Sequence, residues 1–131
     1  MRFPRITLAE WLIRASVAFA FLYPPIDALT DPYSWIGYFP SFLTDLVAPH
    51  GVVLLHAFGL VEVALAVWIL VGRRVRIPAL ICTALLLLII ITNGAQFPVL
   101  FRDLSIAMSA LALAFWPRRT RAPAPPNHDA V

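Results

Sequence analysis

The chain has 131 residues, of which 61% are hydrophobic and 13% are charged. A soluble domain is nearer one quarter charged, so this composition excludes an ordinary soluble surface and indicates an integral membrane protein with one domain. The net charge of +3 comes from ten arginines without a lysine, and they stand at the ends of apolar runs instead of forming one basic face, so no nucleic-acid partner is expected.

Four long apolar segments, separated by prolines, follow one another along the chain. They cover residues of about 6–23, 51–71, 77–97 and 99–116. Each segment approaches the ~20 residues that a helix needs to cross the hydrocarbon layer, and none alternates as a strand does. Proline suits a helix start and disfavours a helix interior, so the prolines are expected at helix ends. The sequence predicts an all-α integral membrane protein, a four-transmembrane-helix antiparallel bundle.

The first segment, "LAEWLIRASVAFAFLY", carries two charges inside an apolar run. A cleaved secretory signal is the alternative to a membrane helix, but Glu10 and Arg14 interrupt the apolar core and "YPPIDA" makes a poor cleavage site. An unpaired charge in the middle of the membrane costs ~3 kcal/mol on insertion scales. Glu62 is central in the second segment, so antiparallel helices would bring it to the depth of Arg14. We therefore predict an Arg14–Glu62 bridge in the bundle interior, with Glu10 as a second, wetter partner.

The connections between the segments differ in length. Residues 24–50 form a long loop rich in Tyr, Trp and Phe, which we expect in the outer membrane interface with a short surface helix around residues 40–47. The third and fourth segments are separated only by "NGAQFP", which predicts a tight antiparallel hairpin.

The placement of arginine predicts the orientation. The arginines that flank the segments all fall on one side of the expected membrane: Arg2, Arg5, Arg73, Arg74, Arg76, Arg118, Arg119 and Arg121. The positive-inside rule puts this side, and with it both termini, in the cytoplasm. The multi-pass chain is thus expected in the inner (cytoplasmic) membrane, with a disordered, proline-rich cytoplasmic tail at residues 118–131.

A second group of polar residues lies near the predicted outer boundary and is expected to line a small pocket. Its members are Asp27, His56, Asn93, Gln96, Arg102 and Asp103. His56 is either a hydrogen-bonded histidine or a ligand, although haem would need a second axial residue. Arg102 and Asp103 are neighbours that should point about 100° apart on a helix, so we do not expect them to neutralise one another. Cys82 is the only cysteine, and no metal site is expected.

Several of these stretches, taken in order, resemble the DoxX-like family of small four-helix membrane proteins. The resemblance is carried by Arg14 with Phe21-Leu22-Tyr23, Gly59 with Glu62, Gly72 with Arg76, and Arg102-Asp103. The chain departs from the family where "PPIDAL" replaces a Gly-x-x-Lys pattern after the first helix. The resemblance implies an inner-membrane subunit associated with a quinone- or thiol-linked oxidoreductase complex, with quinone as a possible cofactor.

Three functions remain open at this level. The first is that subunit, which docks a redox partner protein and is not expected to catalyse alone, since the sequence offers no nucleophile pair, metal motif or nucleotide loop. The second is a small transporter or channel, which would be a homo-oligomer because four helices make a poor pore. The third is a purely structural assembly protein of the lipid bilayer, in which Arg14 and Glu62 only fix the helices.

Overall fold

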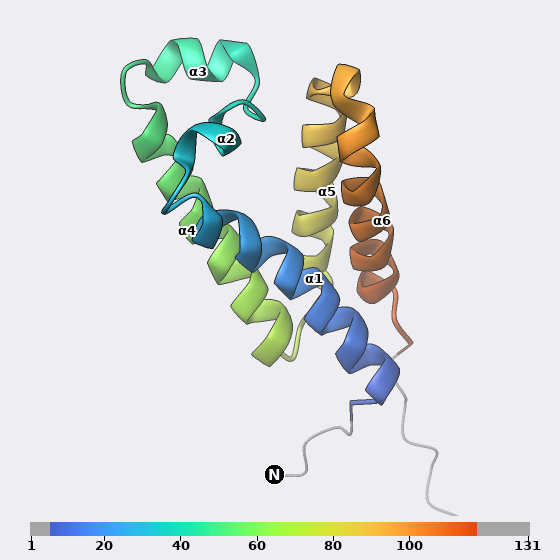
Figure 1. The fold of residues 1–131 in the computed structure, drawn as a ribbon. Helices are drawn as coiled ribbons and strands as arrows, with labels where there is room; N and C mark the ends of the chain where they lie inside the picture. Colours follow the sequence, from blue (N-terminus) through green and yellow to red (C-terminus); the bar gives the residue numbers. More distant parts are fainter. Residues whose placement is uncertain (1–5, 118–131) are drawn as a thin grey trace, which may run out of the picture.

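The computed structural model describes residues 6–117, apart from the side chains of residues 96, 97 and 99. This part of the chain is all-α (Figure 1). Its long helices are α1 (Leu8–Asp27), α4 (Gly51–Val71), α5 (Arg76–Thr92) and α6 (Phe97–Ala114), and its short elements are α2 (Pro32–Ile36), α3 (Ser41–Val47) and the 3₁₀ turn η1 (Gly94–Gln96). The arginines Arg2 and Arg5 and the predicted disordered tail at residues 118–131 lie outside the described residues.

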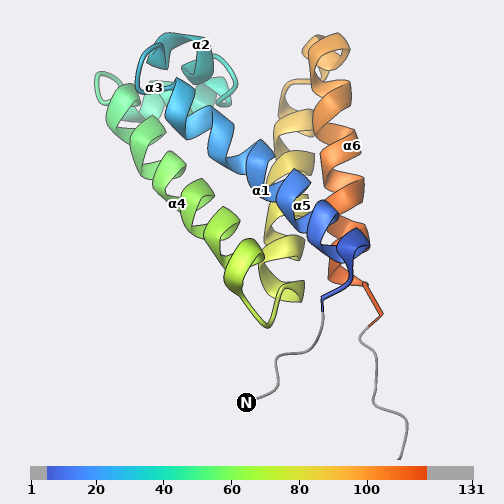
Figure 2. The ribbon, with the colours of Figure 1, turned by 60° about the horizontal axis from the view of Figure 1, so that its bottom comes forward.

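The long helices are arranged as two pairs. α1 packs along α4, α5 packs along α6, and α1 also contacts α6. Figures 1 and 2 show the pairs close together near the α4–α5 turn and farther apart at the opposite end, where α2 and α3 lie over α1 and α4. The buried core follows this arrangement, with Val17, Leu65, Ile69, Cys82 and Leu113 each at most 5% exposed.

The first helix is longer than the sequence predicts. Thr7 caps α1, its side chain accepting a hydrogen bond from the Glu10 amide at 3.2 Å, and the helix continues through Pro24 and Pro25 to Asp27. The predicted end at Tyr23 is therefore wrong. The last turn still closes because the Ala28 amide donates to the Pro24 carbonyl at 2.9 Å, so the prolines remove only their own donors.

The link between α5 and α6 is short and consists mostly of the 3₁₀ turn η1. α5 ends at Thr92, and η1 leads directly into α6, which has Pro98 in its first turn, where a missing N–H costs little. The two helices pack against each other as an antiparallel hairpin. The prediction of a third helix reaching residue 97 is wrong, because the chain reverses already at Asn93.

One helix of the described residues, α4, is long and apolar enough to cross a membrane by length and composition alone. α5 is apolar but has 17 residues. α1 and α6 carry charged side chains, which lower their hydropathy: Glu10, Arg14, Asp27, Arg102 and Asp103.

Candidate functional site

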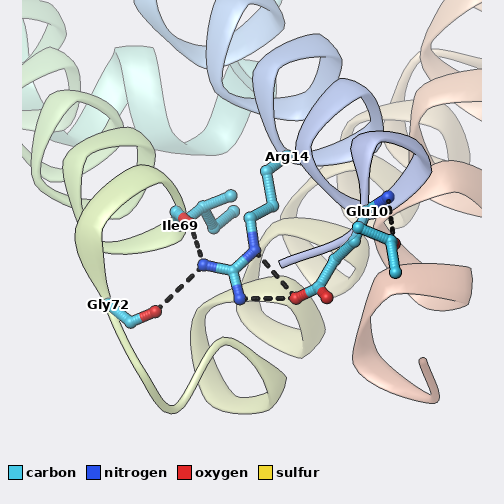
Figure 3. A network of polar contacts seen from close by, with 5 residues as sticks. Glu10, Arg14, Ile69 and Gly72 are labelled. Carbon is cyan, nitrogen blue, oxygen red and sulfur yellow. Dashed lines mark hydrogen bonds and ion pairs between the residues drawn. The ribbon is translucent and has the colours of Figure 1, made fainter. Parts of the chain in front are cut away.

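Arg14 is buried among backbone oxygens at the end of α4 (Figure 3). Its Nη1 donates to the carbonyls of Ile69 at 3.2 Å and Gly72 at 3.0 Å. Its Nη2 and Nε donate to Glu10 Oε1 at 2.6 and 3.2 Å. The last carbonyls of a helix have no partner within the helix, so Arg14 caps the C-terminus of α4 while Glu10 balances its charge.

The predicted Arg14–Glu62 bridge is wrong, and the expected second partner, Glu10, is the acid that Arg14 binds. The reason is the direction of the side chain. A helical Cα–Cβ bond tilts toward the helix N-terminus, so Arg14 reaches back toward Glu10 and the α4–α5 turn. Glu62 lies seven residues before Ile69, which is about 10 Å away along the α4 axis.

An apolar cleft of about 520 Å³ lies between the two helix pairs and under the α2–α3 segment. α4 contributes Leu54, Leu55, Phe58 and Glu62, whose spacing puts them on one helical face. The other walls consist mostly of aromatic and aliphatic side chains from α1, the α2–α3 segment, α5 and α6, including Phe19, Tyr23, Trp35, Tyr38, Phe39, Leu43, Leu86, Ile89 and Ile106. We call this space the interhelical cleft.

Aromatic rings form a connected wall in the interhelical cleft. The Phe19 and Tyr23 ring centroids are 6.4 Å apart, and Tyr23 meets Trp35 edge-on at 6.3 Å. Tyr38 continues the series 5.9 Å from Trp35. On another side, Phe39 and Phe58 pack edge-to-face at 5.5 Å. The two edge-to-face pairs have a favourable geometry for aromatic rings, and the other two pairs are tilted at similar centroid distances.

Glu62 brings an acidic group to this apolar space. It is half-buried and lines the cleft next to Phe58. Among the described residues its carboxylate makes no hydrogen bond and no ion pair. Glu62 therefore lines the cleft as an acceptor that the described residues leave unused.

Arg102 and Asp103 also line the cleft, from α6. Contrary to the expectation from their adjacent positions, they pair, with Arg102 Nε 3.3 Å from Asp103 Oδ1. The long arginine side chain can fold back over its neighbour, although the two Cβ atoms diverge. Its side chain is 59% exposed and that of Asp103 is 14% exposed.

The other members of the predicted outer pocket lie elsewhere. Asp27 accepts a hydrogen bond from Trp35 Nε1 at 2.9 Å, and Asn93 donates to the Tyr38 carbonyl at 2.9 Å. His56 is exposed, with its Nδ1 2.8 Å from the Val52 carbonyl of its own helix. Gln96 belongs to η1, and its side chain lies outside the described part of the chain. Of the described members, Arg102 and Asp103 line the interhelical cleft and Asn93 lines a separate, smaller cavity.

The aromatic walls are what the sequence-based site prediction missed. Their residues are spread over α1, the long loop and α4, and only the folded chain brings them together. The signal was present, since the loop of residues 24–50 is rich in aromatic residues, but these rings also suit a membrane interface.

Comparison with known proteins gives one match. A family model described as DoxX matches residues 9–95, which run from α1 into η1. This range contains the Arg14 network, Glu62 and the aromatic walls, whereas Arg102 and Asp103 follow it. No curated protein and no solved structure matches the chain.

Proposed function

The chain belongs to the DoxX family of membrane proteins, and from this premise we propose that it is an inner-membrane subunit that holds a quinone-class ligand for an associated oxidoreductase. In this proposal all four long helices cross the membrane as an antiparallel bundle. Both termini and the arginine-rich α4–α5 turn face the cytoplasm, and α2 and α3 lie in the outer interface.

The interhelical cleft is the observation that carries the proposal. Its volume of about 520 Å³ lies within the range of small-ligand sites, and its walls are apolar and aromatic, as a hydrophobic ring system requires. Flat rings stack well on such walls. A quinone dissolved in the bilayer would reach a cleft between membrane helices without passing through water.

The polar groups of the cleft suit the oxygens of such a ring. The Arg102 guanidinium has donors beyond the one bonded to Asp103, and a quinone carbonyl is an acceptor. The unused carboxylate of Glu62 is an acceptor, which suits the hydroxyl of the reduced ring. One ligand class could thus use both groups in its two redox states.

The electrons are assigned to a partner protein. Reduction of a quinone needs an electron donor, and the DoxX-like resemblance implies a quinone- or thiol-linked oxidoreductase as its source. In this proposal the chain binds and orients the quinone ring, and the partner protein transfers the electrons to it. We assign the Arg14 network a structural role, since four of the five N–H donors of Arg14 already bind Glu10 and two backbone carbonyls.

The test is saturable binding of decylubiquinone to the purified chain in detergent, followed by tryptophan fluorescence. Trp35 lies in the cleft wall, so binding should quench its emission. Phe58→Ala should weaken binding by about tenfold, because it removes about 1.4 kcal/mol of ring contact. Trp35→Phe should remove most of the quenching. Emission that falls only linearly with added quinone, alike in all three proteins, would overturn the proposal.

A further inference from the structure

The charges that face the interhelical cleft do not cancel. Three charged side chains, two acidic and one basic, line it among the described residues: Glu62, Asp103 and Arg102. Arg102 and Asp103 neutralise one another as an ion pair. What remains is the carboxylate of Glu62, which has no hydrogen bond and no ion pair among the described residues. The cleft therefore carries one net negative charge when Glu62 is ionised.

The Arg102–Asp103 ion pair does not offset the negative charge of Glu62. The Asp103 side chain is 14% exposed and the Arg102 side chain is 59% exposed, so the negative end lies toward the protein and the positive end toward the surroundings. Because Arg102 is paired with Asp103 and makes no ion pair with Glu62, Arg102 does not neutralise the Glu62 carboxylate. An ionised carboxylate without a partner in a low-dielectric setting is costly, and a cation from outside the protein would relieve that cost.

The residues that line the cleft favour an organic cation over a metal ion. No group of three or more His, Cys, Asp and Glu side chains that could hold a metal ion occurs in the described part of the chain. The carboxylate of Glu62 instead shares the cleft with aromatic side chains. Aromatic faces attract organic cations through their quadrupole, and ring cages recognise alkylated ammonium groups in this way. The series Phe19, Tyr23, Trp35 and Tyr38 and the pair Phe39–Phe58 supply such faces around the cleft.

We propose that the interhelical cleft is a binding site for lipophilic organic cations, with Glu62 as the counter-charge and the aromatic walls as the cage. The ligand class is an ammonium or phosphonium ion that carries aromatic or alkyl groups. This goes beyond the proposed function, which concerns a neutral ring. It requires neither a redox partner nor a redox reaction.

The experiment uses the full chain in detergent and two probes of nearly equal shape and opposite charge, tetraphenylphosphonium and tetraphenylborate, in isothermal titration calorimetry. The wild-type chain should bind tetraphenylphosphonium saturably. Glu62→Gln, which keeps the shape and removes the charge, should weaken that binding at least tenfold. The same variant should leave tetraphenylborate binding unchanged or strengthen it.

Two further variants make the result specific. Glu62→Asp keeps the charge and should retain the preference for the cation. Asp45→Asn removes one negative charge from an exposed position on α3 outside the cleft, and should leave the affinity for tetraphenylphosphonium within twofold. Equal cation affinities for the wild-type and Glu62→Gln chains, or an equal loss in Asp45→Asn, would overturn the proposal.

The outcome is independent of the quinone proposal. Decylubiquinone binding in the same preparations tests the neutral ligand alone. Quinone binding without a Glu62-dependent preference for the cation would end only the cation proposal. A Glu62-dependent preference for the cation without quinone binding would end only the quinone proposal.

Discussion

Arg14 shows how one residue can be predicted as important for the wrong reason. A cation in the middle of an apolar segment must have a partner, and the sequence offers two acids for it. The expected membrane depth of the two residues favoured Glu62 as the partner of Arg14. In the structure the Arg14 side chain points toward the N-terminus of its helix and binds Glu10 and two carbonyls at the end of α4. A sequence indicates the depth of a Cα atom, whereas a long side chain spans more than a turn, so the sequence identified both acids but ranked Glu62 above the true partner Glu10.

Replacement of Arg14 should destabilise the chain without touching the interhelical cleft. Arg14→Gln would leave the carbonyls of Ile69 and Gly72 and the carboxylate of Glu10 without their donor, at a cost of about 2–3 kcal/mol. Thermal unfolding in detergent should show a lower Tm. Arg74→Gln, at an exposed position of the α4–α5 turn, is the matched control and should unfold like the wild type. Equal Tm values for the two variants would contradict the capping role.

At the scale of elements, the contact between α1 and α4 depends on a glycine. A Cβ atom on Gly59 would lie 2.9 Å from Pro25 Cβ, closer than side chains normally approach. The sequence places small residues on this face of the second apolar segment, which does favour close packing. It does not show that Pro25 is the residue opposite, because the prolines were expected to end the first helix.

Gly59→Ala should therefore force α1 and α4 apart, with a loss of about 1–2 kcal/mol in the free energy of unfolding. Gly37→Ala is the control, since no atom lies within 4 Å of its added Cβ. Chemical unfolding of the two variants in mixed micelles should separate them clearly. A loss of stability in Gly37→Ala as large as in Gly59→Ala would contradict the role of the Gly59–Pro25 contact, because a methyl group that acts only through the unfolded chain would raise stability.

A single side chain links the α2–α3 segment to the end of α5. Asn93 donates to the Tyr38 carbonyl at 2.9 Å and also to Ile89 O of its own helix at 3.0 Å. Asn93→Ala should loosen the α2–α3 segment that covers the cleft. Ligand association and dissociation should then both become faster, while the affinity changes little. Stopped-flow quenching of Trp35 by decylubiquinone measures these rates. Rates equal to those of the wild type would show that the link does not limit access.

For the molecule as a whole, the sequence predicts the fold class better than the site. Composition and four apolar segments suffice for the all-α class, and the order of weak motifs suffices for the DoxX family, which the family match confirms. The cleft could not be predicted, because it depends on the two helix pairs diverging at one end. Glu62, assigned to a buried bridge, instead faces that cleft.

The proposed topology places α3 on the outer side of the membrane and the α4–α5 turn on the cytoplasmic side. With Cys82, which is buried, replaced by Ala, a single cysteine at Thr44 on α3 should react with a membrane-impermeant maleimide in intact cells. A cysteine at Arg74 in the α4–α5 turn should react only after the membrane is opened. The reverse pattern would invert the chain in the membrane, and reaction of both in intact cells would mean that α4 does not cross it.

The capping of α4 by Arg14 joins α1 to α4 at one end of the molecule. The main core cluster gathers around that same end, whereas the interhelical cleft lies between the helix pairs toward the other end, where Asn93 joins α5 to the α2–α3 segment. Under the proposed function, a ligand would therefore touch the diverging ends of the helix pairs and leave the contacts of Arg14 with Ile69 and Gly72 undisturbed.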